Sequence, residues 1–456
     1  MDAQVRGSHV ARDLSRAQLQ VDEPQVRPLA SLPEVYRSVT LAKGSWLRRL
    51  LSFLGPGYLV AIGYIDPGNW ATDLAGGSAF GYSLLWIVLL SNVMAVVLQS
   101  LAARLGIVAG LDLAQACRLR YSRHSVVAQW LLSEVAICAT DLAEVIGSAI
   151  ALNLLFHIPL QWGVPLTAFD ALLVLWLQQR GFRYFEALIA TLLLTVCACL
   201  GFDLFLAQPA WREVASGFIP HRDVFANRDM LYVAIGIIGA TVMPHNLYLH
   251  SATVQTRKFR LDTRGRSAAI QYSTIDTVMA LTLAFFVNAG ILILAAASFH
   301  TPSDPRSVGI DEAYRLLAPV VGTSIASILF GVALLAAGQS STLTATLAGQ
   351  VVMEGFIELR LAPWLRRLIT RAVAIIPALA VVFMAGTEGI AKLLVLSQAV
   401  LSLQLPFAVV PLIRMTQDRK LMGELVAPRW LTYAAYAATA LIITLNAVLL
   451  WKLMVN

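Results

Sequence analysis

Two short polar motifs interrupt apolar stretches that are each long enough to cross a membrane. Asp66 and Asn69 flank a Pro-Gly pair in the first stretch, and Met243 and His245 flank a proline in the second. A proline or glycine removes helical hydrogen bonds and leaves backbone carbonyls that hydrocarbon cannot satisfy. Carboxylate, amide, thioether and imidazole groups beside such carbonyls are ligands for a metal ion. Two broken helices at matching places in two halves of a chain are typical of a transporter's binding site.

The types of donor narrow the class of metal. A soft thioether from Met243 beside the carboxylate of Asp66 favours Mn, Fe, Co or Cd over Ca and Mg, which prefer shells of oxygen alone. Asn69 supplies an amide oxygen across the unwound turn, and the stretches around Gly63 and Ala240 supply backbone carbonyls. The structural alternative is that the methionine fills a gap in the core and that the carboxylate and amide cap a broken helix.

A polar stripe in the apolar stretch 127–156 indicates a route for protons. Glu134, Asp141 and Glu144 fall within about 80° of one another on a helix. Three carboxyls on one face of a membrane helix predict a proton path or a wet vestibule, and pairing with arginines for stability is the alternative.

Four further residues complete the set of candidates. Arg366 and Arg367 stand at the start of a later apolar stretch, where they are partners for the carboxyls or anchors at the membrane surface. His245 is interpreted as a ligand, a proton carrier or a brace for the broken backbone. Gln398 is interpreted as an interhelical hydrogen-bonding group and as an occasional metal contact.

Composition places all these motifs in a membrane protein. Of 456 residues, 58% are hydrophobic and 13% are charged, whereas soluble domains average about 25% charged residues. The net charge of +7 resides in short loops between apolar runs, so it indicates membrane topology, and no nucleic acid or obligate protein partner is expected. About eleven runs have the length of a membrane span: 51–76, 81–105, 127–156, 163–179, 185–207, 229–255, 273–299, 320–350, 368–385, 390–413 and 431–453.

Charge patterning predicts the topology in a cell inner membrane. Residues 1–45 are polar and lack periodicity, so they are expected to form a flexible tail ahead of a single transporter domain at 46–456. Lys and Arg cluster just before the first span and in every second connection, and Arg257 and Arg371 are counted among the arginines of these basic connections. The positive-inside rule then places the N-terminus in the cytoplasm and, after an eleventh span, the C-terminus outside.

The order of the spans predicts an all-α fold with internal symmetry. Spans one to five, at about 50–207, and spans six to ten, at about 229–413, each open with a broken helix. An odd number of spans in each half inverts one half relative to the other. We therefore expect a five-plus-five inverted repeat with discontinuous first and sixth helices and an extra helix at about 431–453.

With these residues in place, the chain resembles the Nramp family of divalent metal transporters from about residue 50 to its end. The resemblance rests on two motifs and a supporting one: Gly63-Tyr64-Ile65-Asp66-Pro67-Gly68-Asn69, Gly239-Ala240-Thr241-Val242-Met243-Pro244-His245-Asn246, and Ala139-Thr140-Asp141-Leu142-Ala143-Glu144. It implies the LeuT-like fold and proton-coupled import of Mn²⁺ and Fe²⁺, often with Cd²⁺, Co²⁺ or Zn²⁺ accepted. It also implies a secondary transporter that uses no cofactor, and not an enzyme.

The resemblance assigns roles to individual residues. It implies metal coordination by Asp66, Asn69, Met243 and the Ala240 carbonyl, and in some states by the Gly63 carbonyl or Gln398. It links proton movement to Asp66, His245, Glu134, Asp141, Glu144, Arg366 and Arg367. Gly63 stands where many members have alanine, which keeps the carbonyl and changes the flexibility of the backbone. Magnesium-transporting relatives lack the methionine at position 243, so its presence argues against that branch.

Rival functions remain open from the sequence. A transporter of the same architecture that carries an amino acid or Mg²⁺ is the first, and a passive metal channel is the second. An intramembrane metalloenzyme is least favoured, because the sequence contains no H-E-x-x-H motif.

Overall fold

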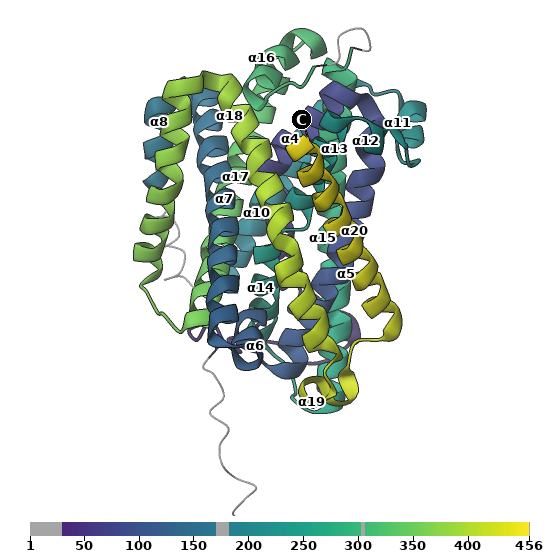
Figure 1. Cartoon of the computed structure of the whole chain (residues 1–456), viewed down its shortest axis with the longest axis vertical. Helices are drawn as coiled ribbons and strands as arrows, with labels where there is room; N and C mark the ends of the chain where they lie inside the picture. The colour runs from purple at the N-terminus through teal and green to yellow at the C-terminus, as the bar shows by residue number, and fades with distance from the viewer. Residues whose placement is uncertain (1–29, 170–181, 302–305, 456) are drawn as a thin grey trace, which may run out of the picture. The chain divides into compact units, whose positions relative to one another are not determined.

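The computed structural model describes residues 30–169, 182–301 and 306–455, apart from a few side chains in the last two long helices. The regular secondary structure of the described residues is helical except for one short parallel pair, in which β1 (Val39–Thr40) lies beside β2 (Arg257–Lys258). Figure 1 shows the long helices running roughly parallel to one another. The helices outside the two breaks are α2 (Trp46–Phe53), η1 (Gly81–Leu84), α5 (Leu85–Ala109), α6 (Leu113–Arg120), α7 (Arg123–Phe156), α8 (Leu160–Leu166), η2 (Thr167–Phe169), α10 (Phe182–Ala207), α11 (Trp211–Gly217), α12 (Asp223–Ala226), η3 (Val254–Thr256), α15 (Thr263–Phe299), α16 (Ile310–Val321), α17 (Ser324–Ile357), α18 (Pro363–Gln417), α19 (Arg419–Met422), η4 (Gly423–Leu425) and α20 (Arg429–Val455).

The structure confirms both predicted helix breaks. The first separates α3 (Pro56–Gly63) from α4 (Pro67–Phe80), and the second separates α13 (Arg228–Thr241) from α14 (Pro244–Thr253). A proline is the first residue of both α4 and α14. Proline is favoured at that position because its fixed φ suits the helix and its missing N–H would have no helical partner there.

Many helices in the described part of the chain are long enough to span a membrane. In these, eight helices are long and apolar enough to cross a membrane, and Leu368–Met384 is a shorter apolar helix. The span predicted at 163–179 runs into residues 170–181, which lie outside the described part. The spans predicted at 368–385 and 390–413 belong to one continuous helix, α18, and Figure 1 shows this helix turning over at the top and descending again.

The segments that connect the long helices lie at the two ends of the bundle. Figure 1 places α11, α12 and α16 at one end and α6 and α19 at the other. The predicted basic connections around 118–123 and 414–420 are those at the α6 and α19 end. Figure 1 also shows the C-terminus at the opposite end.

Part of the stretch predicted as a tail is attached to the bundle. Ser31 donates a hydrogen bond to Asp112 (2.5 Å), and the Arg37 guanidinium donates to the Phe259 carbonyl (2.8 Å). These contacts and the β1–β2 pair hold residues 31–40 beside the connection between α14 and α15. Residues 1–29 lie outside the described part.

Close packing at two glycines brings other helices against the breaks. A Cβ on Gly147 of α7 would collide with Pro67 at the first break, and one on Gly239 would collide with the backbone of Gln398 in α18. Small residues let membrane helices approach closely in this way. The helix α7 therefore packs directly on the start of α4, and α18 packs directly on the end of α13.

Candidate metal-binding site

At each break, the proline leaves the carbonyl four residues before it without a helical partner. In an α-helix the carbonyl of a residue accepts from the N–H four residues later. Gly63 stands four residues before Pro67, and Ala240 stands four residues before Pro244. Because proline has no N–H, neither bond can form. The two carbonyls that the family resemblance assigns to metal coordination are those that the two prolines release.

The carboxylate of the first break reaches the second break through one amide group. The Oδ1 atom of Asp66 accepts hydrogen bonds from the backbone N–H and the side-chain Nδ2 of Asn69, both at 2.8 Å. The same Nδ2 atom donates to the Ala240 carbonyl at 3.1 Å. The other carboxylate oxygen, Oδ2, is buried and has no hydrogen-bond partner among the described residues. Asp66, Asn69 and the Ala240 carbonyl therefore converge.

The thioether lies inside the protein beside the first break. Met243 precedes Pro244 at the start of α14 and has 0% of its surface exposed. Asn246 donates to its sulfur at 3.7 Å, and the same amide nitrogen lies so close to Gly63 that a Cβ there would collide with it. Met243 therefore lies in the interior at the break, and Asn246 links the sulfur to the residue whose carbonyl Pro67 releases.

Gln398 lies between the two broken helices. Its side chain packs against Gly68 and its backbone against Gly239, so closely that neither glycine could carry a Cβ. The amide nitrogen donates to Ser397 at 2.9 Å, and the buried amide oxygen has no partner among the described residues. An unpaired acceptor beside the first break is placed to contact an ion.

Two polar residues that the sequence reasoning missed complete the surroundings. Asn288 of α15 donates to the carbonyl of Tyr64 at 2.7 Å and to Oδ1 of Asn69 at 3.4 Å. Asp73, also buried, lies two turns after Asp66 on the same helix, and the two carboxylates interact electrostatically. The spacing of seven residues places Asp66 and Asp73 on one face of a helix, and it was the signal available in the sequence for Asp73. Asn288 gave no comparable signal, because one amide in an apolar helix has many possible partners.

The predicted proton residues form two ion-paired groups on α7. Arg366 pairs with Glu134 at 3.3 Å, and Trp130 donates to the same carboxylate at 3.1 Å. Glu144 accepts hydrogen bonds from Ser341 (2.7 Å) and Thr342 (3.1 Å) of α17. The side chain of Arg367 lies outside the described residues.

Arg371 is a further residue that the sequence reasoning placed wrongly. It was counted with the arginines of a basic loop, but its side chain is 1% exposed and lies 3.6 Å from Glu144. Its guanidinium also donates to the Asp141 carbonyl (3.2 Å) and to Thr342 (2.6 Å). The available signal was its position inside the predicted span 368–385, where a charge needs a partner.

The two histidines of α14 are both buried but have different surroundings. His245 is 2% exposed, and its Nδ1 atom has no hydrogen-bond partner among the described residues. The imidazole interacts electrostatically with Asp141. His250, one turn further along α14, instead contacts Gln99 at 3.0 Å, and Gln99 donates to the Tyr64 hydroxyl at 2.8 Å. His250 is thus linked through Gln99 to Tyr64 at the first break, whereas the Nδ1 atom of His245 is available for a further hydrogen bond.

A buried clamp fixes the start of α3. Arg257, also first counted as a loop arginine, is fully buried and donates to the carbonyls of Phe53 (2.9 Å) and Leu54 (2.8 Å) while pairing with Glu186 at 2.7 Å. Asp276 accepts from the backbone N–H of Gly57 at 2.7 Å, where its charge complements the helix N-terminus. Side chains from three other elements thus hold the first half of the first broken helix.

The donor set is unlike that of a structural zinc site. Among the described residues, no group of three or more His, Cys, Asp or Glu side chains could hold a metal ion. The two breaks instead join a carboxylate and an amide to the Ala240 carbonyl, and a thioether to Gly63 through Asn246. Such a mixed shell suits a borderline divalent ion that must also be released.

Comparisons with known proteins show what the chain is similar to. The chain matches the family model described as natural resistance-associated macrophage protein-like over residues 57–452. It is 55% identical over 443 residues to the divalent metal cation transporter MntH of Xylella fastidiosa (strain 9a5c), covering 97% of this chain and 94% of that protein. It is 57% identical over 423 residues to the transporter of the same name from Brucella suis biovar 1 (strain 1330), covering 92% and 93%.

Solved structures also resemble this one. The manganese transporter of Eremococcus coleocola superposes with a TM-score of 0.84 at 41% identity, over 91% of this chain and 90% of that chain. Mhp1, a nucleobase-cation-symport-1 family transporter, gives a TM-score of 0.58 at 18% identity, over 87% and 92% of the two chains. The second likeness concerns the fold alone.

Proposed function

The chain belongs to the Nramp family, and on that premise we propose that it imports divalent transition-metal ions together with protons. It is an all-helical, multi-pass membrane protein with a LeuT-like fold, and it is a transporter and not an enzyme. Mn²⁺ and Fe²⁺ are the proposed main substrates, with Cd²⁺, Co²⁺ and Zn²⁺ also accepted.

One observation carries the proposal. The carbonyls that Pro67 and Pro244 release belong to Gly63 and Ala240, and the carboxylate of Asp66 meets the Ala240 carbonyl through a single amide. The Asp66 carboxylate oxygen and the Ala240 carbonyl oxygen, one from each break, therefore both accept a hydrogen bond from the partially positive NH₂ group of Asn69. A cation that takes the place of this group gains both oxygens, and the Asn69 amide, once turned over, presents its own oxygen.

The thioether supplies selectivity in this account. Met243 and Gly63 lie on either side of Asn246, so a cation between the breaks has the sulfur within the same enclosed region. Ca²⁺ and Mg²⁺ gain little from sulfur, whereas Mn²⁺, Fe²⁺ and Cd²⁺ accept it. The site then discriminates by the chemistry of one ligand as well as by size.

Burial of the donors supports alternating access over an open pore. Asp66, Asn69 and Met243 have 0%, 1% and 0% of their surface exposed. An ion reaches them only when the surrounding helices move. The broken helices α3–α4 and α13–α14 are the elements proposed to move against α7 and α18. The clamp of Arg257 and Asp276 on α3 must open for release to the side where that helix begins.

Proton coupling follows from the carboxylate of Asp66. A divalent ion beside it favours its charged form, so metal binding and proton release are linked. The proposed route continues through His245 and Asp141 to the ion-paired groups of Glu144 with Arg371 and Glu134 with Arg366. A membrane potential that is negative inside aids entry by about 2.3 kcal/mol per charge per 100 mV.

The proposed orientation puts the N-terminus and the α6–α19 end of the bundle in the cytoplasm and the C-terminus outside, in a cell inner membrane. The basic connections at one end and the C-terminus at the other support it (Figure 1). Import then proceeds from the α11–α16 end toward the α6–α19 end.

Transport by purified protein in sealed liposomes tests the proposal. With Mn²⁺ outside, we expect Mn²⁺ to enter, the interior to acidify, and both signals to grow faster with a negative-inside potential. Asp66→Asn should abolish both signals, because it removes the charge that binds the metal and carries the proton. Asp229→Asn, the same change at an exposed position of α13, should leave both unchanged. Mn²⁺ entry without any pH change would identify a channel and refute the proposal.

A further inference from the structure

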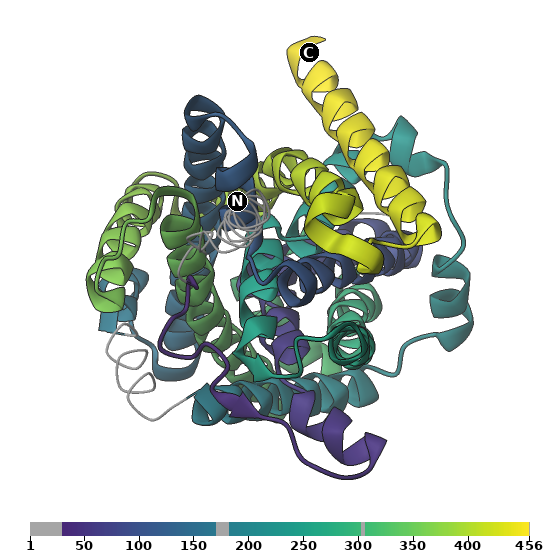
Figure 2. The same cartoon turned by 90° about the horizontal axis from the view of Figure 1, so that it is seen from below.

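An apolar groove runs along the bundle between α7, α18 and α20. Figure 2 shows α20 at the periphery, so the groove faces the surrounding membrane. Its volume is about 670 Å³, and the side chains of Phe407, Ile443 and Leu450 along it are between 43% and 51% exposed. The lining also includes Pro406, Val410 and Pro411, with Tyr121 and Arg414 at the α6 end.

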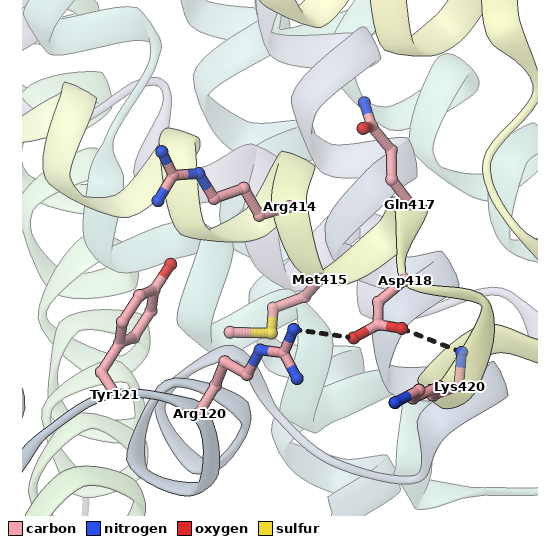
Figure 3. A pocket seen from close by; sticks show the side chains of 7 residues that line it. All are labelled: Arg120, Tyr121, Arg414, Met415, Gln417, Asp418 and Lys420. Atoms are coloured by element: carbon pink, nitrogen blue, oxygen red, sulfur yellow. Dashed lines mark hydrogen bonds and ion pairs between the residues drawn. The ribbon is translucent and has the colours of Figure 1, made fainter.

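A basic pocket adjoins that end of the groove. It has a volume of about 470 Å³ and shares Tyr121 and Arg414 with the groove. Figure 3 shows these two residues on one side and Asp418 and Lys420 on the other, with Met415 between them. Three cationic residues, Arg120, Arg414 and Lys420, and one carboxylate, Asp418, line this pocket. The pocket therefore has an excess of positive charge.

The carboxylate of Asp418 neutralises only part of the positive charge in the pocket. Arg120 lies 3.5 Å from Asp418, whose other oxygen accepts from the backbone N–H of Lys420. Within the part of the chain that the structure describes, neither the Arg414 nor the Lys420 side chain takes part in an ion pair. Two cationic side chains thus remain at the membrane-surface end of an apolar groove.

We propose that the groove and the pocket together bind one anionic phospholipid. An acyl chain lies in the groove, and the anionic headgroup lies in the pocket that Arg414 and Lys420 line. Basic pockets between membrane helices at the cytoplasmic side recognise anionic headgroups, and a tyrosine at this level suits the membrane interface. A zwitterionic lipid would leave the excess positive charge uncompensated, and a free phosphate would leave the groove unused.

Such a lipid connects to the metal site through helix packing. Asn446 of α20 donates to the Ser402 carbonyl of α18 at 2.8 Å and accepts from its hydroxyl at 2.9 Å. The helix α18 also packs against α13, which carries Ala240. A lipid held by α7, α18 and α20 stabilises the scaffold beside the second break.

Lipid binding to the purified full-length protein tests the proposal without any transported metal, so its outcome is independent of the transport proposal. Phosphatidylglycerol and phosphatidylcholine with identical acyl chains would be titrated in detergent, with binding followed by native mass spectrometry. We expect phosphatidylglycerol to bind more tightly, and Arg414→Gln with Lys420→Gln to weaken it by about tenfold or more. The matched pair Lys258→Gln with Arg264→Gln removes the same charges from exposed positions elsewhere and should change nothing.

A second variant tests the groove itself. Ala447 lines the groove, so Ala447→Trp should fill it and also weaken phosphatidylglycerol binding, with no change in charge. Equal losses in both charge pairs would mean nonspecific surface attraction and would overturn the proposal. Equal affinity for phosphatidylcholine, or equally tight binding of glycerol phosphate without acyl chains, would overturn it as well.

Discussion

Met243 is the sulfur donor of the proposed metal site, and its removal tests the origin of selectivity. Met243→Ala should lower Mn²⁺ uptake and reduce the preference for Mn²⁺ over Ca²⁺ by about tenfold, or roughly 1.4 kcal/mol, because an all-oxygen shell remains. Competition between the two ions in the liposome assay measures this directly. Met230→Ala, a buried methionine in α13, is the matched control. Unchanged discrimination in Met243→Ala would exclude the thioether as a ligand.

At the residue scale, sequence reasoning singled out the polar residues that stand where a proline interrupts an apolar stretch. It missed single polar residues that lie within an uninterrupted helix. Asp66, Asn69 and Met243 stand beside prolines in apolar stretches, so their types were informative. Asn288 touches Asn69 from a helix far away in the sequence, and nothing in its own surroundings indicates that contact. Arg371 and Arg257 were placed in loops by charge patterning, which cannot distinguish an anchor at the surface from a buried partner of a carboxylate.

At the scale of elements, the proposed metal site depends on the two prolines, which each deprive one backbone carbonyl of its helical hydrogen bond. Pro244→Ala supplies an N–H to the Ala240 carbonyl, and this new helical bond then competes with the ion. A hydrogen bond contributes about 1 kcal/mol net, so Mn²⁺ affinity should fall by roughly fivefold while thermal stability without metal is maintained or rises. Calorimetric titration and thermal unfolding measure the two quantities.

The matched control lies within another helix. Pro377→Ala removes a proline inside α18, remote from both breaks in the sequence, and should leave Mn²⁺ affinity unchanged. If Pro244→Ala binds Mn²⁺ as tightly as the unaltered protein, the released carbonyl is not a ligand.

Span prediction and helix boundaries diverge for a physical reason. Hydropathy locates where a chain leaves the apolar region, but helical hydrogen bonds continue wherever the backbone stays helical. Hence α18 runs through two predicted spans and the turn between them. Conversely, the first predicted span, 51–76, covers the end of α2 and both halves of a broken helix, because hydrophobicity does not register a proline-induced break.

At the scale of the whole molecule, a few sequence features predicted the architecture. The apolar runs, the alternation of basic connections and the two breaks predicted an all-helical membrane fold, and the match to solved transporters confirms it. The five-plus-five symmetry and the membrane orientation stay predictions. The groove at α20 was not predictable, because it depends on how α7 packs beside α18 and α20, which are far from it in the sequence.

The central claim is that oxygen and sulfur donors from two broken helices meet on one ion. X-ray absorption spectroscopy of Cd²⁺ bound to the purified protein measures the ligand types around the metal directly. We predict one sulfur neighbour for each bound cadmium together with oxygen neighbours, and loss of the sulfur signal in Met243→Ala. A shell of oxygen and nitrogen alone, or a sulfur signal that persists in Met243→Ala, would contradict the account.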